Sequence, residues 1–171
     1  MKNSILASQL ISFIDNSPSP FHVVDQLKKE LRDHGFISLD SSNRWELQKN
    51  GRYFTTVNDS ALIAFDIGEG SVEEQGFKIV AAHTDSPTFR IKPSPEMKVK
   101  NYMKLNTEAY GGPILYTWLD RPLSVAGRVV LRNDDPLHPK RRLVDLHEPI
   151  VIIPSLAIHM NRKVNEGLGL N

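Results

Sequence analysis

Apolar residues recur at helical spacing in the first 35 residues and predict two helices. The second helix is predicted to begin after Ser19, because serine is a favourable N-cap and Pro20 suits the first helical position. Gly35 is expected to end it, since glycine commonly follows the last helical residue. The first helix is expected over residues 3–16, where four apolar side chains share one face: Leu6, Leu10, Phe13 and Ile14.

Strand-like patterns follow the helices. Residues 53–57 and 61–67 are rich in strand-forming side chains, and the polar residues 58–60 between them predict a β-hairpin. Residues 77–82 form a short apolar run, which is typical of a buried strand, and His83 comes directly after it. Helices followed by a buried strand favour an α/β fold made of packed layers.

Beyond about residue 98 the helical signal fades, and a second, β-rich part is expected. Its boundary is placed near residues 93–100, where two prolines interrupt the pattern. This gives two expected domains, residues 1–97 and 98–171, with one further helix over residues 155–164. Short strand-like segments are predicted within the second part at 105–110, 115–119, 123–131, 143–145 and 150–153.

The composition narrows the functional classes. With 21 basic and 20 acidic side chains the formal net charge is +1, so the chain lacks the basic excess of a typical nucleic-acid-binding protein. Cysteine is absent, and any metal must therefore be held by histidine, aspartate or glutamate. No apolar run reaches the ~20 residues of a membrane span, and the N-terminus lacks the pattern of a signal peptide. We therefore expect a cytoplasmic protein that binds neither nucleic acid nor membrane.

His83 and Asp85 form the sharpest candidate site, because ligand sites in α/β sheets form at the carboxyl ends of strands. Side chains two positions apart on an extended backbone point the same way. His83 could therefore bind a metal through one ring nitrogen while Asp85 accepts a hydrogen bond from the other. A structural histidine held by a hydrogen bond is the alternative. His159 lies among apolar neighbours, and there a packed histidine on a helix face is the alternative to a ligand.

Four motifs occur in order along the chain: Ser17–His22, Ala81–Pro87, Tyr110–Gly112 with Tyr116–Arg121, and Ile153–His159. Together they resemble the M18 family of metalloaminopeptidases, which includes aspartyl aminopeptidase. The resemblance implies an α/β catalytic domain into which a β-rich dimerisation domain is inserted. Residues 1–97 would then be the N-terminal segment of the catalytic domain, and residues 98–171 part of the dimerisation domain.

The same resemblance assigns chemistry. It implies two divalent metal ions, usually zinc with manganese or cobalt as alternatives, which polarise the scissile carbonyl and activate a water molecule. His83 matches a metal-binding histidine, Asp85 matches its orienting catalytic carboxylate, and His159 matches a second histidine that binds metal or reaches a neighbouring subunit's site. Peptides are the implied substrates, with acidic first residues preferred in part of the family. The implied quaternary structure is a homo-oligomer in which dimers assemble into a dodecamer.

The family's remaining metal ligands and its base glutamate would lie beyond Asn171. Because zinc takes about four ligands, we expect the isolated chain to show no turnover and at best weak metal affinity. Two other interpretations stay open. One is a non-catalytic fragment that keeps oligomerisation or binding surfaces, and the other is a small β-rich binding module with a helical cap.

Overall fold

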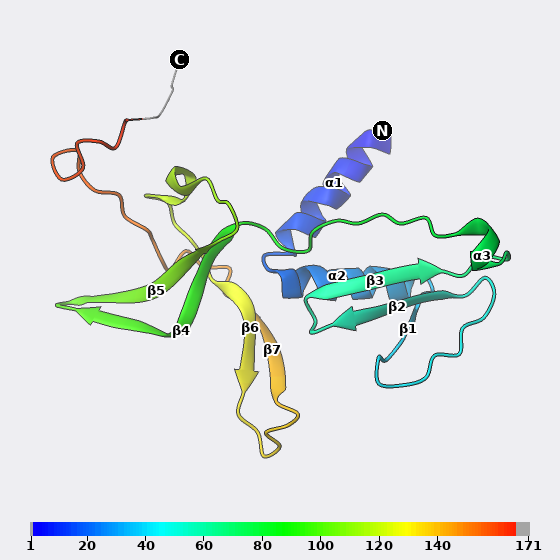
Figure 1. Cartoon of the computed structure of the whole chain (residues 1–171). Helices are drawn as coiled ribbons and strands as arrows, with labels where there is room; N and C mark the ends of the chain where they lie inside the picture. The colour runs from blue at the N-terminus through cyan, green and yellow to red at the C-terminus, as the bar shows by residue number, and fades with distance from the viewer. Residues whose placement is uncertain (1, 167–171) are drawn as a thin grey trace. The chain divides into compact units, whose positions relative to one another are not determined.

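The computed structural model describes residues 2–166, which fall into two compact units built from alternating segments (Figure 1). Of the described residues, the first unit combines 2–86 with 126–145, and the second unit combines 87–125 with 146–166. Helices and β-sheets are both present, in agreement with the expected α/β class.

The two helices predicted at the N-terminus are confirmed as α1 (Lys2–Asp15) and α2 (Pro20–Asp33). Ser19 caps α2, because its Oγ accepts a hydrogen bond from the backbone N–H of His22. Gly35 follows the helix with a φ of 81°, a left-handed conformation that glycine adopts without steric cost. No helix in residues 2–166 is both long and apolar enough to cross a membrane.

The first unit is built around a three-stranded sheet and α2. As the hairpin pattern predicts, β2 (Arg52–Val57) pairs antiparallel with β3 (Ala61–Asp66), and it also pairs parallel with the short β1 (Ile37–Ser38). α2 packs against β1 and β3, and the side chains of Val24 in the helix and Phe54 in β2 are fully buried. Burial of these apolar side chains stabilises the unit.

A second hairpin and a short helix complete the first unit. β6 (Ala126–Leu131) pairs antiparallel with β7 (Lys140–Asp145), and β6 contacts α2. The strands predicted at 123–131 and 143–145 are therefore confirmed with shifted ends. The short helix, α3 (Val72–Gln75), follows β3 along the chain.

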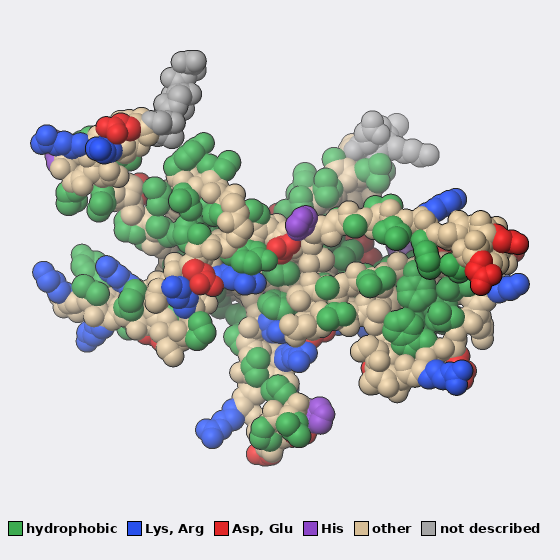
Figure 2. Space-filling view, in the orientation of Figure 1, with side chains coloured by type: hydrophobic (Ala, Val, Ile, Leu, Met, Phe, Trp, Pro, Cys, Tyr) green, Lys and Arg blue, Asp and Glu red, His purple; other side chains and the backbone are tan. Residues whose placement is uncertain are grey.

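The buried strand predicted at residues 77–82 is wrong. The segment belongs to no strand in the described part of the chain, and Val80 is 99% exposed. A strand needs hydrogen-bonding neighbours, and an apolar pattern alone does not supply them. Figure 2 shows hydrophobic side chains spread over much of the visible face of the molecule. His83 therefore follows an exposed, unpaired segment and not the end of a sheet strand.

The long hairpin of the second unit consists of β4 (Thr88–Val99) and β5 (Tyr102–Tyr110). β5 confirms and extends one predicted strand, whereas β4 has no counterpart among the predictions. The register of the pair shifts between Ile91 and Glu96, and Ser94 has a φ of 50°. The two prolines beside Ser94 therefore lie in a bulge, where the ladder does not need their missing N–H groups.

The expected domain boundary near residues 93–100 coincides with this bulge, and β4 continues through it. The compact units are built from alternating segments, whereas the expected domains, 1–97 and 98–171, are consecutive. The division of the chain into a catalytic and an inserted dimerisation domain stays a prediction.

The rest of the second unit has little regular structure. The strand predicted at 115–119 is wrong, because Leu115–Trp118 forms a 3₁₀ helix, η1. The Trp118 ring packs edge-on against Phe89 of β4, with their centroids 5.4 Å apart. The strand predicted at 150–153 is reduced to two isolated bridges, which join Leu119 to Ile153 and Leu123 to Val151.

The helix predicted over residues 155–164 is also wrong, because the stretch consists of irregular backbone and turns. The backbone N–H groups of Met160 and Asn161 both donate to the carbonyl of Ala157, at 2.8 and 3.2 Å. A single turn does not offset the conformational entropy that is lost when a helix nucleates.

Candidate metal centre

His83 and Asp85 are brought together, as the sequence predicts. Nδ1 of His83 lies 3.0 Å from Oδ1 of Asp85, within hydrogen-bonding distance. An ionised carboxylate only accepts hydrogen bonds, so this contact holds the proton of a neutral imidazole on Nδ1 and leaves the lone pair on Nε2. The His83 side chain is 90% exposed, and that of Asp85 is partly buried. The pair thus offers one oriented and accessible nitrogen donor.

The donor chemistry of this pair fits one ligand position of a zinc ion. Neutral imidazole nitrogen is a common zinc ligand, and a histidine ligand usually donates its other N–H to a carboxylate or carbonyl. A closed zinc site takes about four ligands, whereas no group of three or more potential ligands gathers within residues 2–166. The described residues therefore supply part of a site. The metal-binding role of His83 and the orienting role of Asp85 stay predictions.

Thr84, between these two residues, is tied to the hairpin of the first unit. Its Oγ1 donates a hydrogen bond of 2.8 Å to the backbone carbonyl of Ser60, in the turn between β2 and β3. The sequence gives no signal for this contact, because the two residues are 24 positions apart and neither has an unusual neighbour pattern. The His83-Thr84-Asp85 segment is thus anchored although the residues before it are unpaired.

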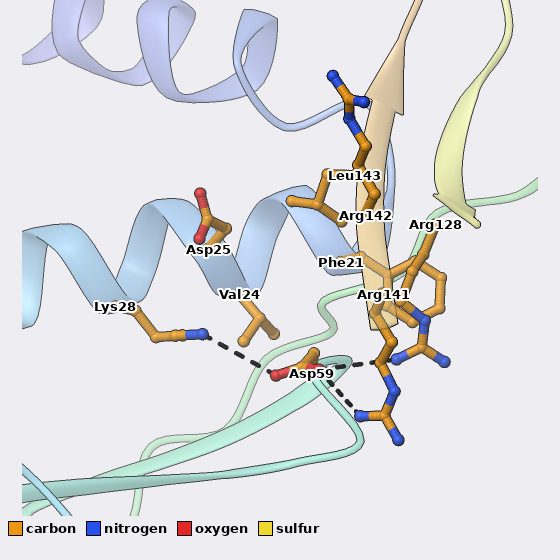
Figure 3. A pocket seen from close by; sticks show the side chains of 9 residues that line it. All are labelled: Phe21, Val24, Asp25, Lys28, Asp59, Arg128, Arg141, Arg142 and Leu143. Carbon is orange, nitrogen blue, oxygen red and sulfur yellow. Dashed lines mark hydrogen bonds and ion pairs between the residues drawn. The ribbon is translucent and has the colours of Figure 1, made fainter. Parts of the chain in front are cut away.

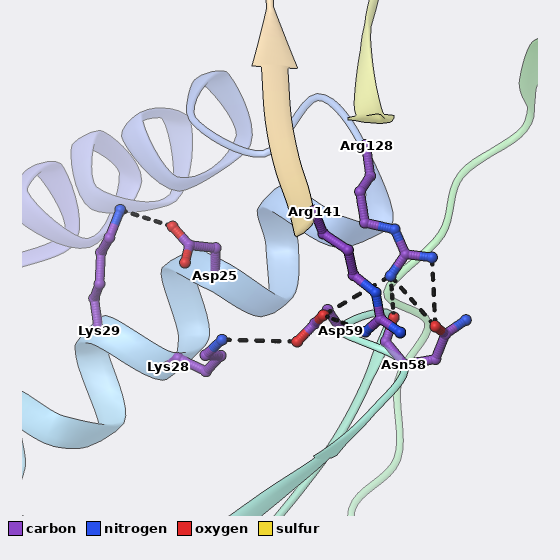
Figure 4. A network of polar contacts seen from close by, with 7 residues as sticks. All are labelled: Asp25, Lys28, Lys29, Asn58, Asp59, Arg128 and Arg141. Carbon is purple, nitrogen blue, oxygen red and sulfur yellow. Dashed lines mark hydrogen bonds and ion pairs between the residues drawn. The ribbon is translucent and has the colours of Figure 1, made fainter. Parts of the chain in front are cut away.

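The same turn carries Asp59, whose carboxylate faces three cationic side chains (Figure 4). Its oxygens lie 3.2 Å from the Arg141 guanidinium, 3.8 Å from that of Arg128 and 3.9 Å from the Lys28 ammonium. These cations come from β7, β6 and α2. One carboxylate therefore links elements that are distant in sequence.

Arg128 is the most buried of the three cations, with its side chain 15% exposed. Its Nη1 donates a hydrogen bond of 2.6 Å to the backbone carbonyl of Asn58, and its guanidinium lies 4.1 Å from the ring centroid of Phe21. These side chains line a recess of about 170 Å³ (Figure 3). The ion pairs of Asp59 join the three cationic side chains that line the recess, and they hold the turn whose Ser60 carbonyl accepts the hydrogen bond from Thr84.

His159 lies in an exposed turn over residues 158–160 of the second unit. The expected alternative of a packed histidine on a helix face is wrong, because that helix does not form and the side chain is exposed. The predicted site residues that the structure brings together are therefore His83 and Asp85. The role of His159 as a second functional histidine stays a prediction.

The sequence model of one protein family, described as aminopeptidase I zinc metalloprotease (M18), matches residues 13–171. This chain belongs to the M18 family of aminopeptidases. A probable M18 family aminopeptidase 2 of Clostridium acetobutylicum is 58% identical over 173 aligned residues, which cover 100% of this chain and 40% of that protein. A protein of the same description from Ectopseudomonas mendocina is 45% identical, over 97% of this chain and 38% of its own length. The chain thus spans about 40% of the length of these M18 relatives.

Solved structures of M18 proteins share the fold. A chain in the cryo-EM structure of the Ape4 and Nbr1 complex is 38% identical, with a TM-score of 0.85 over 96% of this chain and 32% of that chain. The S. cerevisiae mApe1 dodecamer gives 29% identity and a TM-score of 0.82, over 93% of this chain and 37% of that chain. Aminopeptidase I from Borrelia burgdorferi is 27% identical and gives a TM-score of 0.75, over 91% of this chain and 38% of that chain. These matches confirm the α/β class and the resemblance to the N-terminal portion of the family.

Proposed function

We propose that this chain is the N-terminal part of a metal-dependent aminopeptidase, with His83 as a ligand of its metal centre. The contact between His83 and Asp85 carries the proposal, because it orients an exposed imidazole in the way a histidine ligand requires. Membership of a family described as zinc metalloproteases supports zinc as the metal. Manganese and cobalt are the proposed alternatives.

Each residue of the pair has a defined part. His83 presents Nε2 to the cation, and Asp85 accepts the Nδ1–H so that the ring keeps one tautomer and one orientation. A divalent metal held here by His83 would supply the Lewis acidity that polarises a peptide carbonyl and lowers the pKa of a water molecule. His159 is proposed as a second functional histidine, which acts in the metal centre or in the site of a neighbouring subunit.

The proposed substrates are peptides with a free amino terminus, from which the first residue is removed, and an acidic first residue is the candidate preference. The proposed centre holds two metal ions. Because the chain spans about 40% of its relatives, we propose that the unmatched part of such proteins supplies the remaining ligands and that the 171-residue chain alone has no turnover. The similarity to the dodecameric mApe1 structure supports assembly into a homo-oligomer, and a cytoplasmic location stays a prediction.

The test compares the purified chain with its His83→Ala variant, each alone and each co-expressed with the unmatched C-terminal part of the C. acetobutylicum relative. Zinc binding is measured by equilibrium dialysis, and hydrolysis by release of the first residue from peptides that begin with aspartate or leucine. We expect the chain alone to bind zinc weakly through His83 and to hydrolyse neither peptide. Hydrolysis is expected only when the C-terminal part and His83 are both present.

Two results would contradict the proposal in different ways. Hydrolysis by the chain alone would overturn its proposed inactivity, and unchanged zinc binding in His83→Ala would remove His83 as the ligand. Assembly with the C-terminal part, without zinc binding or hydrolysis in any combination, would instead favour a non-catalytic role in oligomerisation or binding.

A further inference from the structure

We propose that Thr84 is a positioning residue for the metal centre and that the turn at residues 58–60, clamped by Arg128 and Arg141, is its support. The inference rests on the proposed function, because it concerns how His83 and Asp85 are held. In this scheme Thr84 contacts neither metal nor substrate and acts through its two neighbours.

The segment before His83 gives the site little support. Residues 77–82 are exposed and unpaired in the described part of the chain, so no sheet holds the backbone that leads into the site. The hydrogen bond of 2.8 Å from Thr84 Oγ1 to the Ser60 carbonyl ties the backbone to the first unit just beyond that segment. Because Thr84 stands between His83 and Asp85, holding it limits the motion of both side chains relative to each other.

The turn that accepts this hydrogen bond has a constrained backbone. Asn58 and Asp59 have φ values of 52° and 54°, both in the left-handed region that non-glycine residues adopt only uncommonly. The backbone N–H of Ser60 donates to the carbonyl of Val57 at 3.1 Å and closes the turn. The Ser60 carbonyl is therefore presented from a turn with little conformational freedom.

Two arginines clamp the turn from the β6–β7 hairpin (Figure 4). Arg128 Nη1 donates to the backbone carbonyl of Asn58 at 2.6 Å, and Arg141 Nη1 donates to Oδ2 of Asp59 at 3.2 Å. Charge-assisted hydrogen bonds of this kind are stronger than neutral ones. A continuous series of contacts thus runs from the hairpin through the turn to Thr84, and all of it lies within the first unit.

The first measurement uses the metal-free 171-residue chain. Long-range ¹H–¹⁵N spectra at about pH 8, where an ordinary imidazole is neutral, report which nitrogen of His83 carries the proton. Wild type and Thr84→Ser, which keeps the hydroxyl, are expected to show mainly the Nδ1–H form. Thr84→Val, which removes the hydroxyl at nearly constant volume, is expected to show a mixture of both tautomers.

Thr117→Val is the matched control, because Thr117 Oγ1 also donates to a backbone carbonyl, that of Ile114 at 2.7 Å, but in the second unit. It is expected to leave the His83 signals unchanged. Arg141→Gln loosens the turn without touching Thr84 and is expected to shift the tautomers in the same direction as Thr84→Val, by a smaller amount. This variant keeps the test decisive should Thr84→Val fail to fold.

The second measurement is a zinc titration against a chromophoric chelator. Thr84→Val is expected to weaken the affinity about tenfold, the low end of the losses seen when a partner of a metal-binding histidine is removed, and Thr84→Ser is expected to bind like wild type. A wild-type tautomer pattern in Thr84→Val and Arg141→Gln, or an equal change in Thr117→Val, would overturn the inference. Should wild type bind zinc no better than His83→Ala, the proposed function fails. The metal-free spectra would still show whether Thr84 positions the His83 ring.

Discussion

Replacing Asp59 by asparagine tests the ion pairs that hold the 58–60 turn. Asn keeps the size of the side chain and tolerates the left-handed backbone at this position, where φ is 54°. The substitution therefore removes the negative charge without adding backbone strain. The three cations that face the carboxylate lose their shared partner and keep their mutual repulsion.

The expected loss follows from the distances and the exposure of the group. Asp59 is 38% exposed, so water screens each of its contacts at 3.2, 3.8 and 3.9 Å, and we assign each the exposed-pair value of about 0.2–1 kcal/mol. Together the three contacts give a range of about 0.6–3 kcal/mol, and its middle predicts that Asp59→Asn lowers the free energy of unfolding of the first unit by about 1–2 kcal/mol. Asp25→Asn is the matched control, because Asp25 makes one pair with Lys29 at 2.9 Å within α2 and should cost about 0.3–0.5 kcal/mol.

Urea unfolding followed by the fluorescence of Trp45, in a Trp118→Phe background, measures these differences for the first unit. The gap between Asp59→Asn and Asp25→Asn should shrink in 1 M NaCl, where the screening length falls to about 3 Å. Equal losses in the two variants, or a gap that salt does not change, would refute the role assigned to the three pairs. The His83 spectra of Asp59→Asn should move toward mixed tautomers as well, since the turn also supports Thr84.

Two further predictions concern the core and the second unit. Val24→Ala truncates a fully buried side chain of α2 and should lower the free energy of unfolding, measured in urea, by about 2–3 kcal/mol. The control Leu6→Ala, at a side chain that is 64% exposed, should lower it by less than about 0.5 kcal/mol. Equal losses would contradict the packing of α2 on the sheet. Hydrogen bonds from the side chain and then the backbone N–H of Ser155 hold the pKa of the Asp120 carboxyl below its ordinary value. Because the folded pKa is the lower one, this stabilisation is complete above the ordinary value of about 3.9 and is lost as the pH falls through the folded pKa. The amide proton shift of Ser155, followed against pH, should report that loss. Asp120→Asn should show the low-pH value of this shift already at neutral pH. In the control variant Asp40→Asn, the Ser155 shift should change with pH as it does in wild type.

Local signals explain which elements the sequence predicts. The start of α2 depends on Ser19 and Pro20, which stand side by side, and the β2–β3 hairpin depends on the polar turn at 58–60 between two strand-forming runs. The contact between His83 and Asp85 is predicted for the same reason, because it joins side chains two positions apart. In each case the residues that determine the geometry are neighbours in the sequence.

The elements and contacts that the sequence does not predict depend on distant partners. β4 is recognisable through its pairing with β5, because the bulge hides its pattern. Asp59 and Arg141 are 82 positions apart, and no periodicity reports such a pair. The apolar run at 77–82 and the helical pattern at 155–164 indicate which side chains favour burial. Regular structure also needs a packing surface that buries those side chains, and the structure leaves the side chains of both segments exposed.

The His83–Asp85 pair of the candidate site is preorganised, whereas the segment that precedes it, residues 77–82, is exposed and unpaired. The contact between His83 and Asp85 closes over two residues and is anchored through Thr84, so it forms inside the first unit. Val80, three residues before His83, is 99% exposed, and covering a side chain of this kind stabilises a complex by about 1.5–3 kcal/mol. A polypeptide that packs against residues 77–82, such as the unmatched part of the M18 relatives proposed above to complete the site, would gain this burial. The proposed metal ion would meet an imidazole that is already oriented, so the cost of ordering His83 would not reduce the affinity for the metal. Loosening Thr84 or Asp59 should therefore weaken metal binding more than it weakens the docking of such a polypeptide.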